Sequence, residues 1–246
     1  ADPTLNTGNL TRINENIKTN LRHLNNAYEL NAFLDSKNAK LLDITCSDYS
    51  TLFRIIENDA VELYGIGQNI NDALMVNDIS NTDVISITRC DKFHNFLNTN
   101  QYDIEDLNII QTVSSTMIYS KDYVYAIGNN ENYNLGIDTP QSTELVESVQ
   151  IINLMKKENS RINKIILNNS STIIYLDNNK VYGLGESVMF KYLTSISSSI
   201  WLQTPTELDV INNFVNINDY VIERIEGGSL HFKFLLVSLK KLEKEW

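Results

Sequence analysis

A short phrase with the pattern Tyr-x-x-Gly occurs three times in the chain, and it limits the possible folds more than any other feature. The copies are Leu63–Gly67, Val124–Gly128 and Val181–Gly185, and their final glycines lie 61 and 57 positions apart. A recurring period of this size is the signature of a repeat architecture. The sequence therefore predicts an array of similar units that follow one another along the chain.

A second run of β-forming residues precedes each phrase. These runs are residues 50–56, 115–120 and 171–176, and a short polar turn separates each run from its phrase. Two such runs joined by a polar turn are typical of a β-hairpin. The first two hairpins then continue into a polar loop that ends on Leu74 or Leu135. We expect each hairpin to leave its sheet through this loop.

The placement of glycine supports the repeat. The chain has nine glycines, and only Gly8 lies outside the repeat copies. Because glycine is scarce, its clustering indicates positions where the backbone needs a positive φ or a close approach between strands. The residues that we expect to define the repeat structurally are Tyr64, Gly67, Tyr125, Gly128, Tyr182, Gly185, Gly227 and Gly228.

The second copy resembles the repeat of the regulator of chromosome condensation family, in which a strand and a turn precede Val-Tyr-x-x-Gly-x-Asn-x-x-x-x-Leu-Gly. The segment Val124–Gly136 keeps the Tyr, both Gly, the Asn and the Leu of that pattern, and Ile225–Phe232 is similar to the part that precedes the hairpin. The resemblance implies an all-β fold, a β-propeller with blades of four antiparallel strands.

The length of the chain fits about four such blades. Propellers close with about four to eight blades, and the family usually has about seven. A partial propeller leaves sheet edges and apolar blade faces without partners, which is a liability. Three alternatives follow: the chain is a fragment, a partner supplies the missing blades, or the blade number is unusual. We favour the first two.

We divide the chain into three parts. Residues 1–40 form an N-terminal segment, helical or looped, that packs on the first blade; residues 41–239 form the repeats; and residues 240–246 form a charged tail. The first part carries a stripe of apolar residues at helical spacing: Ile17, Leu21, Leu24 and Tyr28. Between the first two copies, the residues from Cys90 to Glu105 are expected to form a polar loop.

Composition and charge narrow the class of partner. The share of hydrophobic residues is 42% and that of charged residues 21%, as in ordinary soluble globular proteins. No apolar run approaches the length of about 20 residues that a membrane-spanning helix needs. The net charge of −11 argues against direct binding to nucleic acid or to an anionic membrane. No signal peptide is visible, which leaves the compartment open and favours an intracellular location.

The sequence offers no group of residues for catalysis or for a cofactor. The two cysteines, Cys46 and Cys90, are too far apart to predict a metal cluster or a disulfide framework. The three histidines have no second ligand at metal-binding spacing, and Cys90 lies too near His94 in sequence to form a usable nucleophile and base. Neither a phosphate-binding Gly-x-x-x-x-Gly-Lys loop nor a Gly-x-Ser-x-Gly turn occurs. We expect no enzyme activity, cofactor or metal.

Two stretches that depart from the repeat are candidates for binding a partner. After Gly185 the loop of the family pattern is replaced by an aromatic segment that contains Phe190, Tyr192 and Trp201. Exposed aromatic residues are enriched at binding hot spots. The second stretch is the expected polar loop with His94 and Tyr102. For the aromatic segment the alternative is a structural role, in which its side chains cover the outer edge of a blade.

The function that we expect is a non-catalytic scaffold that binds a protein partner through its blade loops, because loops on a rigid framework commonly carry recognition. The partner could be one that completes the propeller. The alternative is a guanine-nucleotide exchange factor for a small GTPase, since founding members of the family have that activity. No residue of this chain matches the wedge that such members use, so the alternative rests on the resemblance alone.

Overall fold

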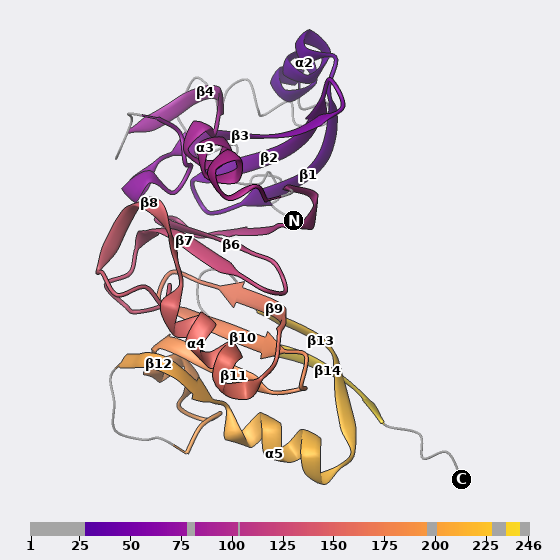
Figure 1. The fold of residues 1–246 in the computed structure, drawn as a ribbon, viewed down its shortest axis with the longest axis vertical. Helices are drawn as coiled ribbons and strands as arrows, with labels where there is room; N and C mark the ends of the chain where they lie inside the picture. The colour runs from indigo at the N-terminus through magenta and orange to yellow at the C-terminus, as the bar shows by residue number, and fades with distance from the viewer. Residues whose placement is uncertain (1–27, 78–81, 103, 196–200, 228–234, 242–246) are drawn as a thin grey trace, which may run out of the picture.

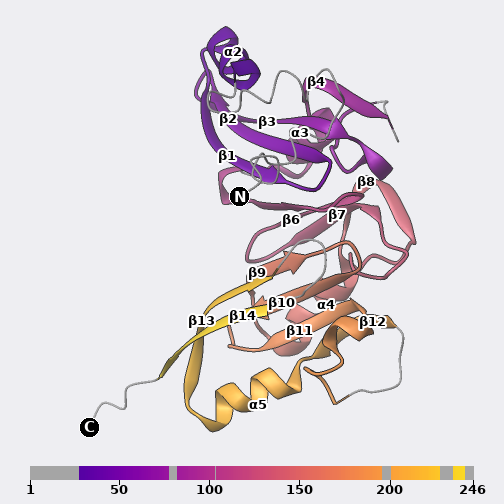
Figure 2. The same ribbon diagram turned by 180° about the vertical axis from the view of Figure 1, so that it is seen from behind.

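The computed structural model describes residues 28–77, 82–102, 104–195, 201–227 and 235–241. Three sheets of four antiparallel strands follow one another along the chain, and a sheet of two strands follows them. Figure 1 shows the sheets stacked from the N-terminal to the C-terminal end of the molecule, and Figure 2 shows the same stack from behind. The expected helical stripe before Tyr28, and Gly228, lie outside the described residues.

The strands of each larger sheet pair in chain order. The first sheet contains β1 (Lys40–Cys46), β2 (Ser50–Glu57), β3 (Ala60–Gln68) and β4 (Asp83–Arg89). The second contains β5 (Asn108–Gln111), β6 (Ser115–Tyr119), β7 (Val124–Asn129) and β8 (Gln141–Glu147). The third contains β9 (Ile162–Leu167), β10 (Ser171–Leu176), β11 (Val181–Glu186) and β12 (Trp201–Glu207). The fourth contains β13 (Tyr220–Gly227) and β14 (Leu235–Lys241).

Each Tyr-x-x-Gly phrase forms the third strand of its sheet, and its last glycine occupies an equivalent position. Gly67, Gly128 and Gly185 each pair with the first residue of the preceding strand, which is a serine in all three sheets. Their φ angles are +119°, +110° and +99°, and an added Cβ would lie 2.2 to 2.4 Å from a backbone carbonyl oxygen. Only glycine fits such a close approach. The repeat inferred from these glycines is confirmed.

An α-helix precedes each sheet, which the sequence analysis did not foresee as a regular feature. The helices are α2 (Tyr28–Lys37), α3 (Asp91–Asn100), α4 (Val149–Glu158) and α5 (Asp209–Ile217). Three short 3-10 helices complete the described elements: η2 (Ile70–Asp72), η3 (Ile104–Asp106) and η4 (Ser187–Phe190). The structural repeat is therefore a helix followed by four strands.

The expected polar loop at residues 90–105 is wrong, because α3 occupies most of it. Phe93 and Leu97 are spaced by one helical turn and are both buried, which is the pattern of an amphipathic helix. The helix ends at Gln101, which has a left-handed backbone conformation. Polar side chains such as Asn95 and Asn98 lie on the solvent side of the helix. Because such residues are frequent in this stretch, its composition alone does not reveal the buried apolar face.

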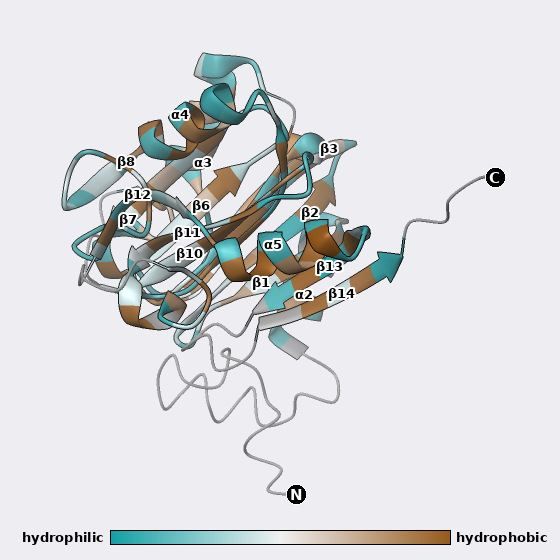
Figure 3. Cartoon of the chain, turned by 90° about the horizontal axis from the view of Figure 1, so that it is seen from below, coloured by the Kyte–Doolittle hydropathy of each residue, from teal (hydrophilic) through white to brown (hydrophobic). Residues whose placement is uncertain are grey.

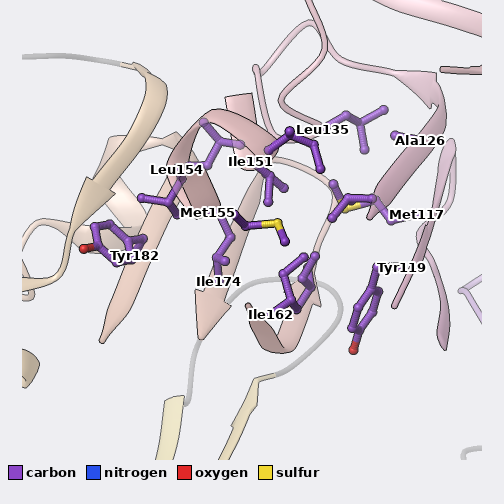
Figure 4. Close-up of a cluster of buried hydrophobic side chains, with 14 of the residues drawn as sticks. Met117, Tyr119, Ala126, Leu135, Ile151, Leu154, Met155, Ile162, Ile174 and Tyr182 are labelled. Atoms are coloured by element: carbon purple, nitrogen blue, oxygen red, sulfur yellow. The ribbon is translucent and has the colours of Figure 1, made fainter. Parts of the chain in front are cut away.

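The helices pack in the gaps between successive sheets, and each gap has its own hydrophobic core. The gap between the first and second sheets holds α3, and the gap between the second and third holds α4. Figure 4 shows the second of these cores, where Ile151, Leu154 and Met155 of α4 lie between the strands of the two sheets. The helix α5 lies between the third and fourth sheets. The helix α2 covers the outer face of the first sheet through Leu30, Phe33 and Leu34.

Two described elements lie at the expected boundaries of the repeat array. The helix α2 falls inside the expected N-terminal segment, and it stands before β1 as α4 stands before β9. At the other end, β14 continues to Lys241, so the first two residues of the expected charged tail are part of a strand. The residues from 242 onward lie outside the described part of the chain.

Candidate protein-interaction surfaces

Two of the five residues proposed for partner binding, His94 and Tyr102, line one hollow of about 590 Å³. The hollow lies between β3, β4 and α3, and Glu62 and Arg89 line it as well. Arg89 Nε donates to Glu62 Oε2 at 2.6 Å, and His94 Nε2 lies 3.2 Å from the same carboxylate oxygen. The helix α3 brings His94 and Tyr102 together, although the sequence predicted a loop there.

His94 has a structural role that the repeat itself explains. The backbone N–H of Leu63, the residue before the first Tyr of the pattern, donates to His94 Nε2 at 3.1 Å. In α5 the equivalent residue is Asn212, whose Oδ1 accepts from the N–H of Val181 at 2.9 Å. Both side chains therefore tie a helix to the third strand of the preceding sheet. Burial lowers the pKa of His94, and the neighbouring Glu62 carboxylate opposes that shift.

Tyr102 takes part in an aromatic contact between repeats. Its ring stacks on that of Tyr123 with centroids 4.2 Å apart, and its hydroxyl lies 2.9 Å from that of Tyr125. Phe96 of α3 packs edge-on against Tyr125, with the two ring centroids 4.6 Å apart. These contacts join the connection after α3 to the second sheet. The half-buried Tyr102 therefore contributes to packing as well as to the wall of the hollow.

The structure separates the three aromatic residues of the other stretch. Phe190 is fully buried, and its ring covers Gly183, so its side chain is not on the surface. Tyr192 is 82% exposed, and Trp201 is half-buried at the start of β12. Of the three, Tyr192 has the exposure that a binding residue needs.

A surface that the sequence analysis missed lies on α5. Val210, Phe214 and Ile217 recur at spacings of four and three, so they share one face of this helix, and all three are more than half exposed. Figure 3, which views the molecule from below, shows hydrophobic residues, drawn in brown, along α5. The spacing of these residues is visible in the sequence, and it was the signal that could have revealed the surface. We call Val210, Phe214 and Ile217 the α5 stripe.

Comparison with α4 shows why Phe214, the middle residue of the stripe, is uncovered. The residue before α4 and the residue before α5 both donate their N–H to the first residue of the third strand in the preceding sheet, at 2.9 Å in each case. Counted from these residues, Phe214 is equivalent to Leu154. Leu154 is 4% exposed in the core between two four-stranded sheets, whereas Phe214 is 53% exposed. The helices α3 and α4 contact the outer strands β8 and β12, but the described fourth sheet has no third or fourth strand to cover α5.

A second hollow, of about 380 Å³, lies where the first strands of the sheets meet. Cys46, Gln111 and Leu167 line it from β1, β5 and β9, together with Glu226 of β13. Each of these strands is the first of its sheet and lies at one edge of it. Among the described residues, no group of three His, Cys, Asp or Glu side chains is placed to hold a metal ion. No helix among these residues is long and apolar enough to cross a membrane.

Comparison with known proteins identifies the architecture. No protein-family model matches the chain, and no curated protein matches its sequence. A crystal structure of yeast RCC1 (Prp20) with Kap60 bound to it matches with a TM-score of 0.51 and 13% identity, over 77% of this chain and 40% of that chain. The structure of Prp20p from Saccharomyces cerevisiae gives 0.51 and 13%, over 82% and 44%. The chain has the RCC1-like β-propeller fold.

Each four-stranded sheet is therefore a blade, as the resemblance in the second repeat implied. Human WBSCR16 gives a TM-score of 0.47 at 12% identity, over 69% of this chain and 39% of that chain. The chain spans less than half the length of the matched structures. Its three complete blades and its two-stranded fourth sheet form an arc and not a closed ring. The Prp20p structure was described together with the binding of that protein to Gsp1p and histones.

Proposed function

We propose that the chain is a non-catalytic scaffold that binds a protein partner at the open, C-terminal end of its blade array. The observation that carries this proposal is the α5 stripe. Phe214 is exposed beside a sheet of two strands, whereas the equivalent Leu154 is buried, and Val210 and Ile217 add exposed apolar surface on the same face of α5. Exposed apolar side chains that gather on one face mark a site of interaction.

The geometry also defines the shape of the partner element. In the complete blades, a third and a fourth strand follow the second, and the fourth strand packs on the helix of the same repeat. A β-hairpin from the partner would extend the fourth sheet from β14 and cover the α5 stripe. Extension of a sheet by a strand from another chain is a common mode of recognition.

The test is a comparison of two substitutions on the same helix. Phe214→Glu places a charge in the stripe, whereas Asn213→Glu places the same charge at an exposed neighbouring position outside it. Each variant is purified by an affinity tag from the source cells, and the mass of the complex is measured in solution. We expect Phe214→Glu to lose the partner and Asn213→Glu to keep it. Equal retention by both variants would contradict the proposal.

The second candidate is guanine-nucleotide exchange on a small GTPase. The fold similarity to Prp20p, whose structure was described with its binding to Gsp1p, is the observation that favours it. No residue of this chain has been matched to an exchange function. The nucleotide-release rate of small GTPases decides between the two: a scaffold leaves the rate unchanged, and an exchange factor increases it. Fold alone does not settle this point.

A further inference from the structure

The hollow that contains His94 has both apolar and polar side chains in its lining. The apolar part consists of Val61, Leu97, Ile104 and the ring of Tyr102, and the polar part consists of Glu62, Arg89, His94, Asn98 and Gln101. Such a lining suits a ligand with an apolar stem and a polar head, which is the character of a long charged side chain. We call this site the His94 hollow.

One oxygen of Glu62 is available to a ligand. Arg89 Nε lies 2.6 Å from Glu62 Oε2, and His94 Nε2 lies 3.2 Å from the same atom. The other oxygen, Oε1, has no hydrogen-bond or ion-pair partner among the residues that the structure describes. The Glu62 side chain is 20% exposed, so the carboxylate is within reach of solvent. A carboxylate oxygen is a strong acceptor for a cationic donor.

The charged groups around Glu62 have a net negative charge. Arg89 is the cation of the lining, and its Nη1 also donates to Asp91 Oδ1 at 2.9 Å, so one guanidinium faces two carboxylates. One positive and two negative groups give a net charge of −1. Burial lowers the pKa of His94, which keeps the imidazole neutral at about pH 7. This local sign favours a cationic ligand over an anionic one.

The C-terminal end of α3 adds to the negative potential of the hollow. Leu97 and Asn98 of the last helical turn line the hollow, as does Gln101 just after it. A helix C-terminus carries about half a negative charge, which a cation stabilises. The last turn of α2 and that of α4 contain lysines, whereas α3 has no basic residue in its last turn. No side chain of α3 itself therefore compensates this helix end.

We propose that the His94 hollow binds a lysine side chain from a basic segment of a partner protein. The ammonium group donates to Glu62 Oε1 beside the end of α3, and the methylene stem lies on Tyr102 and Leu97. Because only one oxygen of Glu62 is free, the paired hydrogen bonds that favour arginine cannot form, whereas an ammonium group does not need such a pair. The net charge of −11 attracts a basic partner over longer distances.

Contacts within the chain hold the walls of the site in place. His94 Nε2 accepts from the Leu63 N–H, and the Tyr102 hydroxyl lies 2.9 Å from that of Tyr125. A preformed site of this kind pays little ordering entropy when a ligand binds. The hollow lies between β3, β4 and α3, far along the chain from α5. The inference therefore does not depend on the function proposed above.

The first measurement uses three short probes and the intact chain. The peptides are acetyl-Gly-X-Gly-amide, where X is lysine, norleucine or arginine, and norleucine has the apolar stem without the ammonium group. Backbone amide signals of Asn98 and Gln101 are followed by nuclear magnetic resonance at about 0.15 M salt. We expect saturable shifts with the lysine peptide in the millimolar range and none with norleucine. Equal shifts with norleucine, or tighter binding of the arginine peptide, would overturn the proposal.

The second measurement places the same charge on two sides of α3. Asn98→Lys introduces an ammonium group into the His94 hollow, whereas Thr99→Lys introduces it into a separate hollow on the other side of the helix. Both variants have the same net charge, so general attraction by the acidic chain is matched. We expect Asn98→Lys to weaken binding of the lysine peptide at least tenfold and Thr99→Lys to weaken it less than about twofold. Equal weakening would show that the peptide binds without a specific site.

The role of Glu62 is tested by Glu62→Gln, which removes the charge and keeps an oxygen that can accept from Arg89 Nε. We expect at least a tenfold loss of lysine-peptide binding. Thermal unfolding of the same variant is the check that the blade is intact. If this variant is folded and binds the peptide as tightly as the wild type, Glu62 does not receive the ammonium group and the proposal is wrong.

The third measurement uses the complex with the natural partner. We expect Asn98→Lys to weaken the complex, Thr99→Lys to retain it, and acetylation of the partner's lysines to weaken binding to the wild type. A complex that requires Phe214 but responds to neither Asn98→Lys nor lysine acetylation would overturn this inference and leave the proposed function intact. A complex that is lost with Asn98→Lys but retained with Phe214→Glu would support the lysine site and contradict the proposal for α5.

Discussion

The two ends of the array differ in what their outermost helix exposes. At the N-terminal end, α2 directs Leu30, Phe33 and Leu34 onto the first blade, and its exposed residues include Asn31, Ala32 and Asp35. At the C-terminal end, α5 buries Val215 but exposes the α5 stripe. Terminal repeats of stacked proteins need a polar outer face to remain in solution as single units. The comparison shows that α2 has such a face and that α5 does not.

The same difference separates α5 from the helices inside the array. A helix in a filled gap contacts one blade on each side, so its apolar residues extend over more than one face. The α5 sequence retains apolar residues on both sides, yet the described fourth sheet covers only one. At Phe214 the helix therefore matches the buried Leu154 of a complete blade interface, whereas Val210 and Ile217 stand where α4 has the polar Gln150 and Lys157.

The largest difference in stability is expected between Leu154, which lies in the core between two complete blades, and the equivalent Phe214, which is exposed. Leu154→Ala opens a cavity in the core between the second and third blades, and we expect it to lower the free energy of unfolding by about 2 to 5 kcal/mol. Phe214→Ala, at the equivalent exposed position, should cost less than about 1 kcal/mol in the isolated chain. Urea-induced unfolding of both variants measures the difference. Equal losses would mean that α5 is already covered.

A second prediction concerns the N-terminal end. Leu30 is 6% exposed and packs in the core that α2 shares with the first blade. We expect Leu30→Ala to lower the free energy of unfolding by about 2 kcal/mol, because it leaves a cavity in the core between α2 and the first blade. Ala32→Ser, on the exposed side of the same helix, is the control and should change stability by less than about 0.5 kcal/mol. A loss as small as that of the control would show that α2 is a dispensable appendage.

The sequence revealed the blades far better than it revealed the helices between them. The phrase Tyr-x-x-Gly recurs because the backbone geometry at Gly67, Gly128 and Gly185 admits only glycine. The residue type is therefore the same at the equivalent position of each blade, and the repeat is visible in the sequence. The helices have no such fixed residue. Their apolar faces contact different blades, and the position that holds His94 in α3 holds Ile152 in α4 and Asn212 in α5. Such a variable pattern can be recognised only after the repeats have been aligned by their strands.

The candidate site was less predictable for a related reason. Exposure of an aromatic side chain depends on what covers it, and the sequence around Phe190 does not show that its ring packs over Gly183. Tyr192, two positions later, is exposed. Phe214 becomes informative only through comparison with its equivalent, Leu154, in the neighbouring repeat. Such equivalence requires the hydrogen-bond register, which coordinates provide and residue types do not.

A third prediction uses the equivalence of His94 and Asn212 to compare α3 with α5. Because burial lowers the pKa of His94 in the folded state, the unfolded chain binds the proton more tightly. The stability that depends on neutral His94 is complete above the ordinary histidine pKa of 6.5 and is lost as the pH falls through and below that value. His94→Asn keeps a side chain that can accept from the Leu63 N–H but does not titrate.

We therefore expect the wild-type unfolding midpoint to fall more steeply than that of His94→Asn between about pH 6.5 and 5. The two proteins should have similar midpoints at about pH 8, where the histidine is neutral in both states. Thermal unfolding followed by circular dichroism over this pH range is the measurement. Parallel curves for the two proteins would show that another group carries the pH dependence and that His94 is not equivalent to Asn212.

The smallest effect on stability, and the most direct test of the difference between the two ends, comes from making the α5 stripe polar. Phe214→Gln with Ile217→Gln removes two exposed apolar side chains from α5 and adds no charge. We expect the free energy of unfolding to change by less than about 1 kcal/mol, because both side chains are more than half exposed and lose little packing beyond the stacking of Phe214 on Tyr220. Binding of the dye 8-anilinonaphthalene-1-sulfonate should fall severalfold, since the dye reports on exposed apolar surface. The matched change at the other end, Ala32→Gln in α2, should leave dye binding unaltered, because α2 already has a polar outer face. If the α5 variant and the α2 variant change dye binding equally, then α5 exposes no more apolar surface than α2 does, and the reason to place a partner on α5 no longer holds.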